Sequence, residues 1–258
     1  MALLGGRSMR DGNVLDAGGE ERRILPLEGR DIAITRDDRR LLAGVSLVID
    51  GPGVTVLMGP NGAGKSLLLR VLANLAQPDL GMVRWAGSTP GRDRATKLGF
   101  VFQKPVMLRR SVLANVRYGL RAAGINRRVA TERAREALAN AGLGHLAGAY
   151  ARVLSGGEQQ RLALVRALAV EPEIMFLDEP TSNLDPASTA AIEQLLLDAV
   201  AKTKPVLVTH DLGQAKRLAD EVVFLHEGRI TEQTVAEQFF TEPASSEARD
   251  YLAGKIVL

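Results

Sequence analysis

The chain has 258 residues, enough for one large domain or two modest ones, and its 46% hydrophobic and 24% charged residues are ordinary for a globular protein. Its 33 basic and 30 acidic residues leave a formal charge of +3 that is spread along the chain, which argues against a nucleic-acid-binding face. The absence of cysteine excludes disulfides and thiolate metal sites, and no apolar stretch reaches the ~20 residues of a membrane span. We therefore expect a soluble chain that does not bind nucleic acid.

Residues 1–23 are rich in Gly, Arg and acidic residues without periodicity, which predicts a disordered lead-in before a single domain over 24–258. Short apolar runs bounded by turn residues predict strands over 31–35, 45–49, 54–58, 81–86, 97–102, 174–177, 206–209 and 222–225. Helices are predicted over 66–76, 158–170, 186–201 and 212–218, with a helical lobe over 111–149. This alternation of strands and helices predicts an α/β fold with a parallel sheet.

The sequence GPNGAGKS at 59–66 fits G-x-x-x-x-G-K-[ST] and lies between a predicted strand and a predicted helix. Its glycines let backbone N–H groups converge on phosphate oxygens, and the helix N-terminus adds partial positive charge. We expect Lys65 to reach the β- and γ-phosphates and the Ser66 hydroxyl to bind Mg²⁺. A glycine-rich turn with a solvated lysine is the alternative. The predicted ATP-binding residues are Gly59, Pro60, Asn61, Gly62, Ala63, Gly64, Lys65, Ser66 and Leu67.

The run IMFLDEP at 174–180 is a predicted buried strand that ends in two carboxylates. Asp178 is placed to hold Mg²⁺ beside the phosphates, directly or through water. Glu179, one residue on, is placed to orient and deprotonate an attacking water. Without the preceding phosphate loop, this acidic pair would be interpreted as a helix cap or a turn.

The run LSGGEQQR at 154–161 places two glycines at the head of a predicted helix. Glycine costs about 1 kcal/mol relative to alanine inside a helix. A pair of them indicates that some group approaches the backbone more closely than a Cβ would permit. Ser155 and the free N–H groups of the helix start would offer that group a site for negative charge.

The order of these sequences resembles that of ABC-transporter ATPase subunits. GPNGAGKS, the glutamine of VFQKP, LSGGEQQR, LDEP, SNLD at 182–185 and the histidine of VTHD follow one another as they do in that family, over roughly residues 25 to 230. The resemblance implies a P-loop NTPase (RecA-like) core with a parallel sheet and an antiparallel β subdomain. It also implies an inserted α-helical subdomain over about 104–165.

The resemblance further implies that LSGGEQQR caps the γ-phosphate of ATP held by a second copy of the chain, so that two ATP molecules lie in a head-to-tail dimer. In that dimer Ser155, Gly156, Gly157 and Glu158 would bind ATP in trans, and Asp185 would pass between the subunits. From the sequence itself, Asp185 is equally the N-cap of a helix that opens at residue 186.

Two loop residues take catalytic roles by the same resemblance. Gln103 resembles the glutamine that reaches Mg²⁺ and the attacking water, and His210 resembles the histidine that touches the γ-phosphate. In isolation they would be a solvent-facing glutamine and a structural or exposed histidine.

Two positions depart from the family pattern. Arg36 stands where the family usually places an aromatic residue that stacks on adenine; a guanidinium plane can also stack on a base. A solvated turn residue is the alternative for Arg36. Leu67 stands where many relatives carry a hydroxyl residue, which removes one phosphate contact but leaves the backbone N–H.

We expect the ATPase subunit of an importer, working at the cytoplasmic face of the membrane through separate permease subunits and, indirectly, a solute-binding protein. A non-transport ABC ATPase and another P-loop enzyme, such as a small-molecule kinase, are the alternatives. The first usually has a coiled-coil insertion or two cassettes, and the second leaves LSGGEQQR unexplained. Residues 101–121 and 211–240 most resemble ATPases of tungstate importers. Phosphate, molybdate and amino-acid importers are the alternatives.

Overall fold

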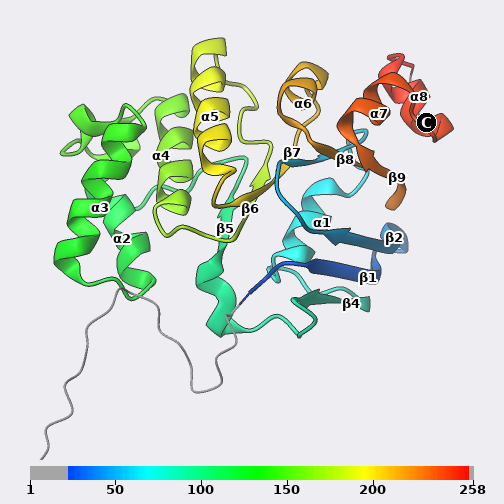
Figure 1. The fold of residues 1–258 in the computed structure, drawn as a ribbon, viewed down its shortest axis with the longest axis horizontal. Coiled ribbons are helices and arrows are strands. Elements are labelled where there is room, and N and C mark those ends of the chain that lie inside the picture. The colour runs from blue at the N-terminus through cyan, green and yellow to red at the C-terminus, as the bar shows by residue number, and fades with distance from the viewer. Residues whose placement is uncertain (1–22, 256–258) are drawn as a thin grey trace, which may run out of the picture.

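A six-stranded sheet lies at the centre of the molecule in the computed structural model, which describes residues 23–255 (Figure 1). Its strand order is β5-β6-β7-β3-β8-β9; the first five run parallel, and β9 pairs with β8 antiparallel. The strands are β3 (Thr55–Met58), β5 (Leu98–Val101), β6 (Ile174–Asp178), β7 (Lys204–Val208), β8 (Glu221–His226) and β9 (Arg229–Val235). The predicted disordered lead-in, residues 1–23, lies outside the described residues except for Arg23.

The central parallel strands are covered on both faces. β3, β6 and β7 are buried at every position, which explains their nearly continuous apolar sequences. The carboxyl ends of such strands meet at one edge of the sheet, where α/β proteins bind their ligands. The turn after β3, the acidic pair at the end of β6 and the loop after β7 therefore meet at this edge.

A second, antiparallel sheet has the order β2-β1-β4 and consists of β1 (Leu27–Arg36), β2 (Arg39–Ile49) and β4 (Leu80–Trp85). Buried and exposed residues alternate along most of β2, as expected for a sheet with one face on the core and one in water. Its buried face shares an apolar cluster with helix α1 (Lys65–Leu72) and the central sheet. The indole N–H of Trp85 donates to the Leu72 carbonyl at 3.1 Å and fastens β4 to α1.

Helices α2 (Val112–Ala122) and α3 (Arg127–Asn140) lie at the opposite end of the molecule from the antiparallel sheet and pack on α4 (Gly156–Leu168) (Figure 1). One apolar cluster runs from these helices to the central sheet. The remaining helices are α5 (Pro186–Ala199), α6 (Leu212–Leu218), α7 (Ala236–Thr241) and α8 (Ser246–Leu252), with 3₁₀ turns η1 (Arg92–Lys97), η2 (Gly144–Leu146) and η3 (Ala151–Val153).

The predicted elements and the observed ones differ mostly at their ends. The helix predicted over 158–170 begins at Gly156, because Ser155 caps it, and the helix predicted over 66–76 ends at Leu72, before Asn74 adopts a left-handed φ of 57°. Strand β9 and helices α7 and α8 were not predicted from the sequence. β9 mixes polar and apolar residues and is only partly buried, so its sequence carries no clear strand period.

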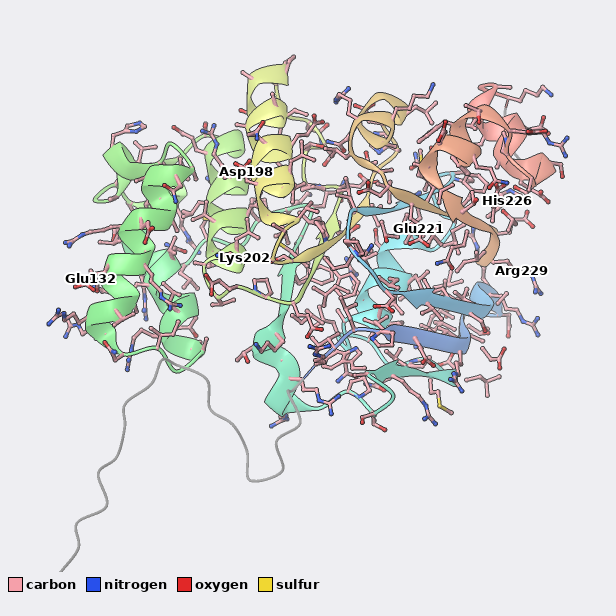
Figure 2. All side chains as sticks on the ribbon, in the orientation of Figure 1. Glu132, Asp198, Lys202, Glu221, His226 and Arg229 are labelled. Atoms are coloured by element: carbon pink, nitrogen blue, oxygen red, sulfur yellow. The ribbon has the colours of Figure 1, made fainter. Side chains whose placement is uncertain are left out.

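Charged side chains of both signs occur on several elements. Figure 2 labels examples on separate elements: Glu132 on α3, Asp198 on α5, Lys202 after it, Glu221 and His226 on β8 and Arg229 on β9. Within residues 23–255, no helix combines the length and apolar character needed to cross a bilayer.

Candidate functional site

The turn between β3 and α1 is shaped by glycines that approach neighbouring backbone. Gly59 has a φ of 142°, and a Cβ there would lie 1.9 Å from the carbonyl oxygen of Leu225. Gly64 has a φ of 102°, and its Cβ would lie 2.7 Å from the Leu41 carbonyl oxygen. A side chain is therefore excluded at both positions. Gly64 is also the N-cap of α1, which has no side-chain cap, so N–H groups of its first turn remain available to an anion.

Lys65 lies inside this turn and is only 6% exposed. Its ammonium group donates to the carbonyl oxygens of Gly59 at 2.7 Å and Pro60 at 2.8 Å. Burial lowers the pKa of Lys65, while the nearby carboxylates of Glu179 and Asp178 oppose that shift. Because an ammonium group has three N–H donors, one remains for a phosphate oxygen.

Ser66 and Asp178, the two residues predicted to bind Mg²⁺ from these elements, are in direct contact. The Ser66 hydroxyl donates to Asp178 Oδ1 at 2.5 Å, and Asp178 is 3% exposed at the end of β6. Hydroxyl and carboxylate oxygens suit Mg²⁺, which typically uses one or two carboxylates plus substrate phosphates. In the described part of the chain, no group of three or more His, Cys, Asp or Glu could hold a metal.

Arg70, which was not predicted from the sequence, lies with its Nη2 3.8 Å from the second oxygen of Asp178. Its position four residues after Ser66 on α1 places both side chains on one face of the helix. That spacing is the signal that would have identified Arg70. Arg70 adds positive charge beside the carboxylate that is expected to hold Mg²⁺.

The Glu179 side chain contacts residues from two other loops that are distant from it in sequence. Its Oε2 accepts a hydrogen bond from Gln103 Nε2 at 2.9 Å, and its Oε1 lies 3.4 Å from His210 Nδ1. Its backbone N–H donates to the Val208 carbonyl at 3.1 Å, and its φ is 45°, a left-handed conformation that is uncommon outside glycine. The three predicted catalytic side chains are therefore brought together, with the Glu179 carboxylate at their centre.

The LSGGEQQR segment forms a helix start whose polar groups bond to one another. Ser155 caps α4, and Glu158 Oε2 accepts hydrogen bonds from the Ser155 N–H at 2.8 Å and hydroxyl at 2.7 Å. This is a capping box. The Ser155 hydroxyl, followed by its N–H, holds the pKa of Glu158 below its usual range.

The two glycines of this segment have different surroundings. Gly157 is buried, and a Cβ there would lie 2.3 Å from Ser188 Oγ on α5. Gly156 is exposed, and a Cβ there would meet nothing within 4 Å. Gly157 therefore lets α4 pack closely on α5 within the same chain, while Gly156 faces open space.

Asp185 is the N-cap of α5, with proline at the first helical position. It accepts hydrogen bonds from the Ser188 N–H at 2.9 Å and hydroxyl at 2.6 Å, and the hydroxyl bond is the main reason why the pKa of Asp185 is lowered. Figure 1 shows α4 and α5 well separated from α1. Within the chain, the LSGGEQQR helix start and the phosphate loop are thus separate sites.

Arg36 ends β1 and is held by an ion pair. Its Nη1 donates to both carboxylate oxygens of Asp79 at 2.9 Å and to the Thr35 carbonyl at 2.6 Å, and the side chain remains 56% exposed. The Thr35 N–H and then Arg36 lower the pKa of Asp79. Stacking of Arg36 on adenine stays a prediction.

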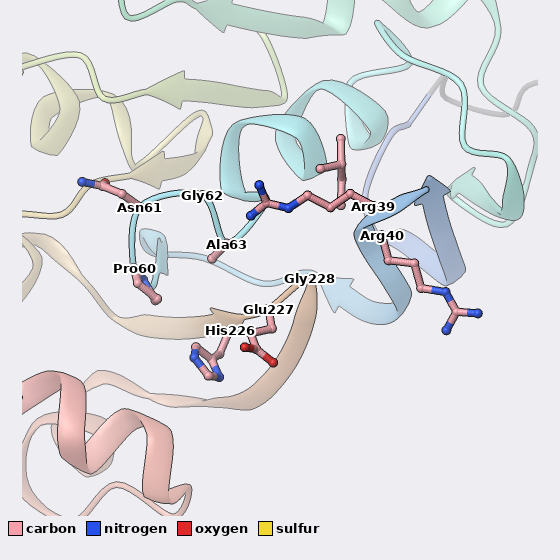
Figure 3. A pocket seen from close by; sticks show the side chains of 10 residues that line it. Arg39, Arg40, Pro60, Asn61, Gly62, Ala63, His226, Glu227 and Gly228 are labelled. Atoms are coloured by element: carbon pink, nitrogen blue, oxygen red, sulfur yellow. The ribbon is translucent and has the colours of Figure 1, made fainter. Parts of the chain in front are cut away.

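A cavity of about 420 Å³ lies against the phosphate loop (Figure 3). Its lining comes from the start of β2, the loop and the β8–β9 turn: Arg39, Arg40, Leu41, Pro60, Asn61, Gly62, Ala63, His226, Glu227 and Gly228. In Figure 3 the Arg39 side chain extends toward Gly62 and Ala63, whereas Arg40 points away. Arg39 is a basic neighbour of the loop that the sequence analysis did not single out.

Comparisons with known proteins agree with this arrangement of the site. The family model described as "ABC transporter" matches residues 42–182. The chain is 40% identical over 234 residues to "Phosphate import ATP-binding protein PstB 1" of Vibrio cholerae serotype O1, covering 84% of this chain and 85% of that protein. It is 34% identical over 249 residues to "Phosphate import ATP-binding protein PstB" of Mycoplasmoides gallisepticum, covering 90% and 77%.

A solved structure described as the ATP-binding subunit of an ABC transporter is similar with a TM-score of 0.77 at 25% identity, over 88% of this chain and 99% of that one. The predicted fold class, a P-loop NTPase core with a parallel sheet and an additional antiparallel sheet, is confirmed. The chain therefore belongs to the ABC transporter family and is an ATPase whose hydrolysis of ATP is coupled to transport.

Proposed function

We propose that this chain is the ATPase subunit of an importer for phosphate, working as a head-to-tail dimer on separate permease subunits. The observation that carries the proposal is the 40% identity, over 84% of the chain, to the phosphate import protein of Vibrio cholerae. The site residues act on ATP and not on the transported solute, so the choice of phosphate rests on the relatives.

The phosphate-binding residues have separable roles. Backbone N–H groups of the loop and of the α1 start bind the β- and γ-phosphates, and the remaining Lys65 N–H donates to them. Ser66, Asp178 and Gln103 would hold Mg²⁺, which neutralises phosphate charge when bound. Glu179 accepts the proton of the attacking water, while Gln103 and His210 orient its carboxylate through the two contacts described above.

The exposed helix start of α4 supports the trans role of LSGGEQQR. Ser155 and Gly156 are exposed at the positive end of a 13-residue helix, although the Ser155 N–H bonds Glu158 in this chain. We propose that Ser155, Gly156, Gly157 and Asp185 complete the ATP site of a second copy, and that Glu158 lines this site with a charge that opposes the phosphate. Each dimer would then bury two ATP molecules.

An apolar groove of about 440 Å³ supports the contact with a permease. It lies where the end of α2 faces β5 and α4, and its lining includes Phe100, Val106 and Tyr118, of which Val106 and Tyr118 are exposed. Val106 follows Gln103 closely in the chain, so a permease segment seated in the groove would contact the loop that bonds Glu179. The chain would thus be held at the cytoplasmic face of the membrane, with a solute-binding protein acting through the permease.

Tungstate is the second candidate solute. Residues 101–121 and 211–240 resemble the corresponding segments of tungstate-importer ATPases. Phosphate and tungstate are both tetrahedral oxyanions, so the two proposals share one transport architecture and differ in the binding protein that delivers the solute.

The test is uptake in cells that lack this chain. Restoring the full-length chain should restore uptake of radiolabelled phosphate, and excess unlabelled tungstate should not suppress it. A Glu179→Gln chain is the matched control, because it keeps the fold but should not support uptake. If cells that lack the chain lose tungstate uptake and regain it when the chain is restored, while phosphate uptake never changes, the transported solute is tungstate. If the uptake of neither anion changes, the proposal of an oxyanion importer is wrong.

A further inference from the structure

A cluster of buried polar side chains lies beside the catalytic loops and outside the phosphate loop. Gln214 on α6 is 1% exposed and Glu193 on α5 is 9% exposed. Burying polar groups is unfavourable unless they are hydrogen-bonded. Their partners are Thr181, in the segment after β6, and Arg217 on α6.

The side-chain amide of Gln214 is the centre of this cluster. Its Nε2 donates to Thr181 Oγ1 at 3.0 Å and to Glu193 Oε1 at 3.0 Å, and its Oε1 lies 3.2 Å from the Thr181 hydroxyl. Arg217 donates to both oxygens of Glu193, at 2.7 and 3.1 Å, in a bidentate pair. Burial raises the pKa of Glu193, but the bonds from Arg217 and Gln214 outweigh it and keep the carboxyl ionised.

The cluster links the two segments that carry catalytic side chains. Thr181 lies two residues after Glu179, and Gln214 lies four residues after His210. Glu179 has a left-handed φ of 45°, a conformation that persists only where its surroundings hold it. The Glu193–Arg217 ion pair connects α5 to α6. The hydrogen bond between Thr181 and Gln214 therefore connects the Glu179 segment to this pair of helices.

We propose that Gln214 is a positioning residue for ATP hydrolysis: through Thr181 it keeps the Glu179 carboxylate at the distance from His210 that the reaction requires. Neither Gln214 nor Thr181 touches the nucleotide in this proposal. The proposal rests on the roles of Glu179 and His210 proposed above.

The experiment uses the full-length chain with Thr181→Val, Gln214→Leu and Thr181→Ser. Valine has the shape of threonine without the hydroxyl, whereas serine keeps the hydroxyl. Thr181→Val and Gln214→Leu should each lower kcat about tenfold to hundredfold, with KM for ATP changed by less than about twofold. Thr181→Ser should restore kcat. Thr131→Val, which removes a hydroxyl that bonds the Arg127 carbonyl on α3, is the matched control.

The combined Thr181→Val and Gln214→Leu variant should be no slower than either single variant, because both remove the same link. If Gln214→Leu does not fold, Thr181→Val carries the test by itself. A normal kcat in Thr181→Val, with only a lower melting temperature, would overturn the proposal. So would a rise in KM that accounts for the whole loss of kcat/KM.

Glu179→Gln, measured in parallel, separates this proposal from the proposed function. If Glu179→Gln is inactive while Thr181→Val turns over normally, only the positioning role of Gln214 fails. If Glu179→Gln hydrolyses ATP normally, the proposed general base is wrong and the positioning role fails with it.

Discussion

The two helix starts that we propose as phosphate-binding sites differ in their caps. The α1 start follows Gly64, has no side-chain cap, and lies beside the buried ammonium group of Lys65. The α4 start follows Ser155 and carries a complete capping box, in which the Glu158 carboxylate accepts both donors of Ser155. At α4 the two donors of Ser155 therefore already bond a carboxylate, whereas at α1 no side-chain cap competes for the N–H groups of the first turn.

Two glycine-rich sequences of this chain therefore form two different kinds of helix start, one without a side-chain cap and one with a capping box. At α1 the N–H groups of the first turn have no side-chain cap, so the proposed site is formed within a single chain. At α4 the Ser155 donors bond Glu158, so in the proposed dimer a partner's phosphate would compete with Glu158 for the hydroxyl of Ser155. Binding at α1 should be independent of dimerisation, whereas binding at α4 should require it.

The largest effect is expected for Glu179→Gln, which should lower the hydrolysis rate about 10²–10⁴-fold, because a general base typically contributes that much. ATP affinity should be unchanged, since the α1 site stays intact, and the ATP-bound dimer should accumulate. Steady-state turnover and light scattering with ATP measure the two effects. Turnover near that of the parent chain would exclude Glu179 as the base.

Lys65→Ala should weaken ATP binding about tenfold to hundredfold, because a hydrogen bond to a charged group contributes about 1.5–3 kcal/mol. Calorimetry with the isolated chain measures the affinity. Lys202→Ala, which removes an exposed ammonium 3.8 Å from Glu171, is the control and should bind ATP normally. An unchanged affinity in Lys65→Ala would remove this residue from the α1 site.

Gly156→Asp should leave ATP binding and folding intact but weaken the ATP-dependent dimer about tenfold or more, since an acidic residue in the first turn suits the helix dipole yet repels a partner's phosphate. Mixing Gly156→Asp chains with Lys65→Ala chains should restore some dimer, because one composite site is then intact. Dimerisation of Gly156→Asp at parental ATP concentrations would contradict the trans role.

In contrast to Gly156→Asp, Gly157→Ala should affect the stability of the fold. Its methyl group would meet Ser188, so we expect a loss of about 1–3 kcal/mol in the free energy of unfolding from overpacking. Chemical denaturation measures this loss. An alanine tolerated without destabilisation would show that the α4–α5 contact does not require glycine.

Glu158→Gln should give the smallest effect. Glutamine can still form the capping box, so folding should be preserved, but the charge that competes with phosphate is gone. We expect dimerisation at about two- to fivefold lower ATP concentration, the equivalent of about 0.3–1 kcal/mol at a helix terminus. Glu247→Gln, in the first turn of α8, is the control. Unaltered ATP dependence in Glu158→Gln would mean that the capping box does not oppose the partner.

The pH dependence of Glu158 has a defined sign. Because its pKa is lowered in the folded chain, its contribution to stability is present above the pKa of the unfolded chain and is lost as pH falls through the folded pKa. The parent chain should therefore lose more stability on acidification than Glu158→Gln does.

Features with contiguous residues were predictable from local sequence. The phosphate loop, the Asp178–Glu179 pair and the Asp185 cap lie at the element boundaries where their sequences predict them, whereas the cap at Ser155 was not predicted. Strands with continuous apolar sequences were also recognisable, because burial on both faces requires such sequences. β9 was not, because a partly buried edge strand has no such requirement.

Contacts between side chains distant in sequence were not predictable and depend on how the elements pack. Gln103 and His210 reach Glu179 because β5, β6 and β7 deliver their loops to one edge of the sheet, and no local pattern encodes that convergence. The different roles of Gly156 and Gly157 also depend on how α5 packs on α4. Local conformation follows from neighbouring residues, whereas contacts between elements follow from the packing of the whole chain.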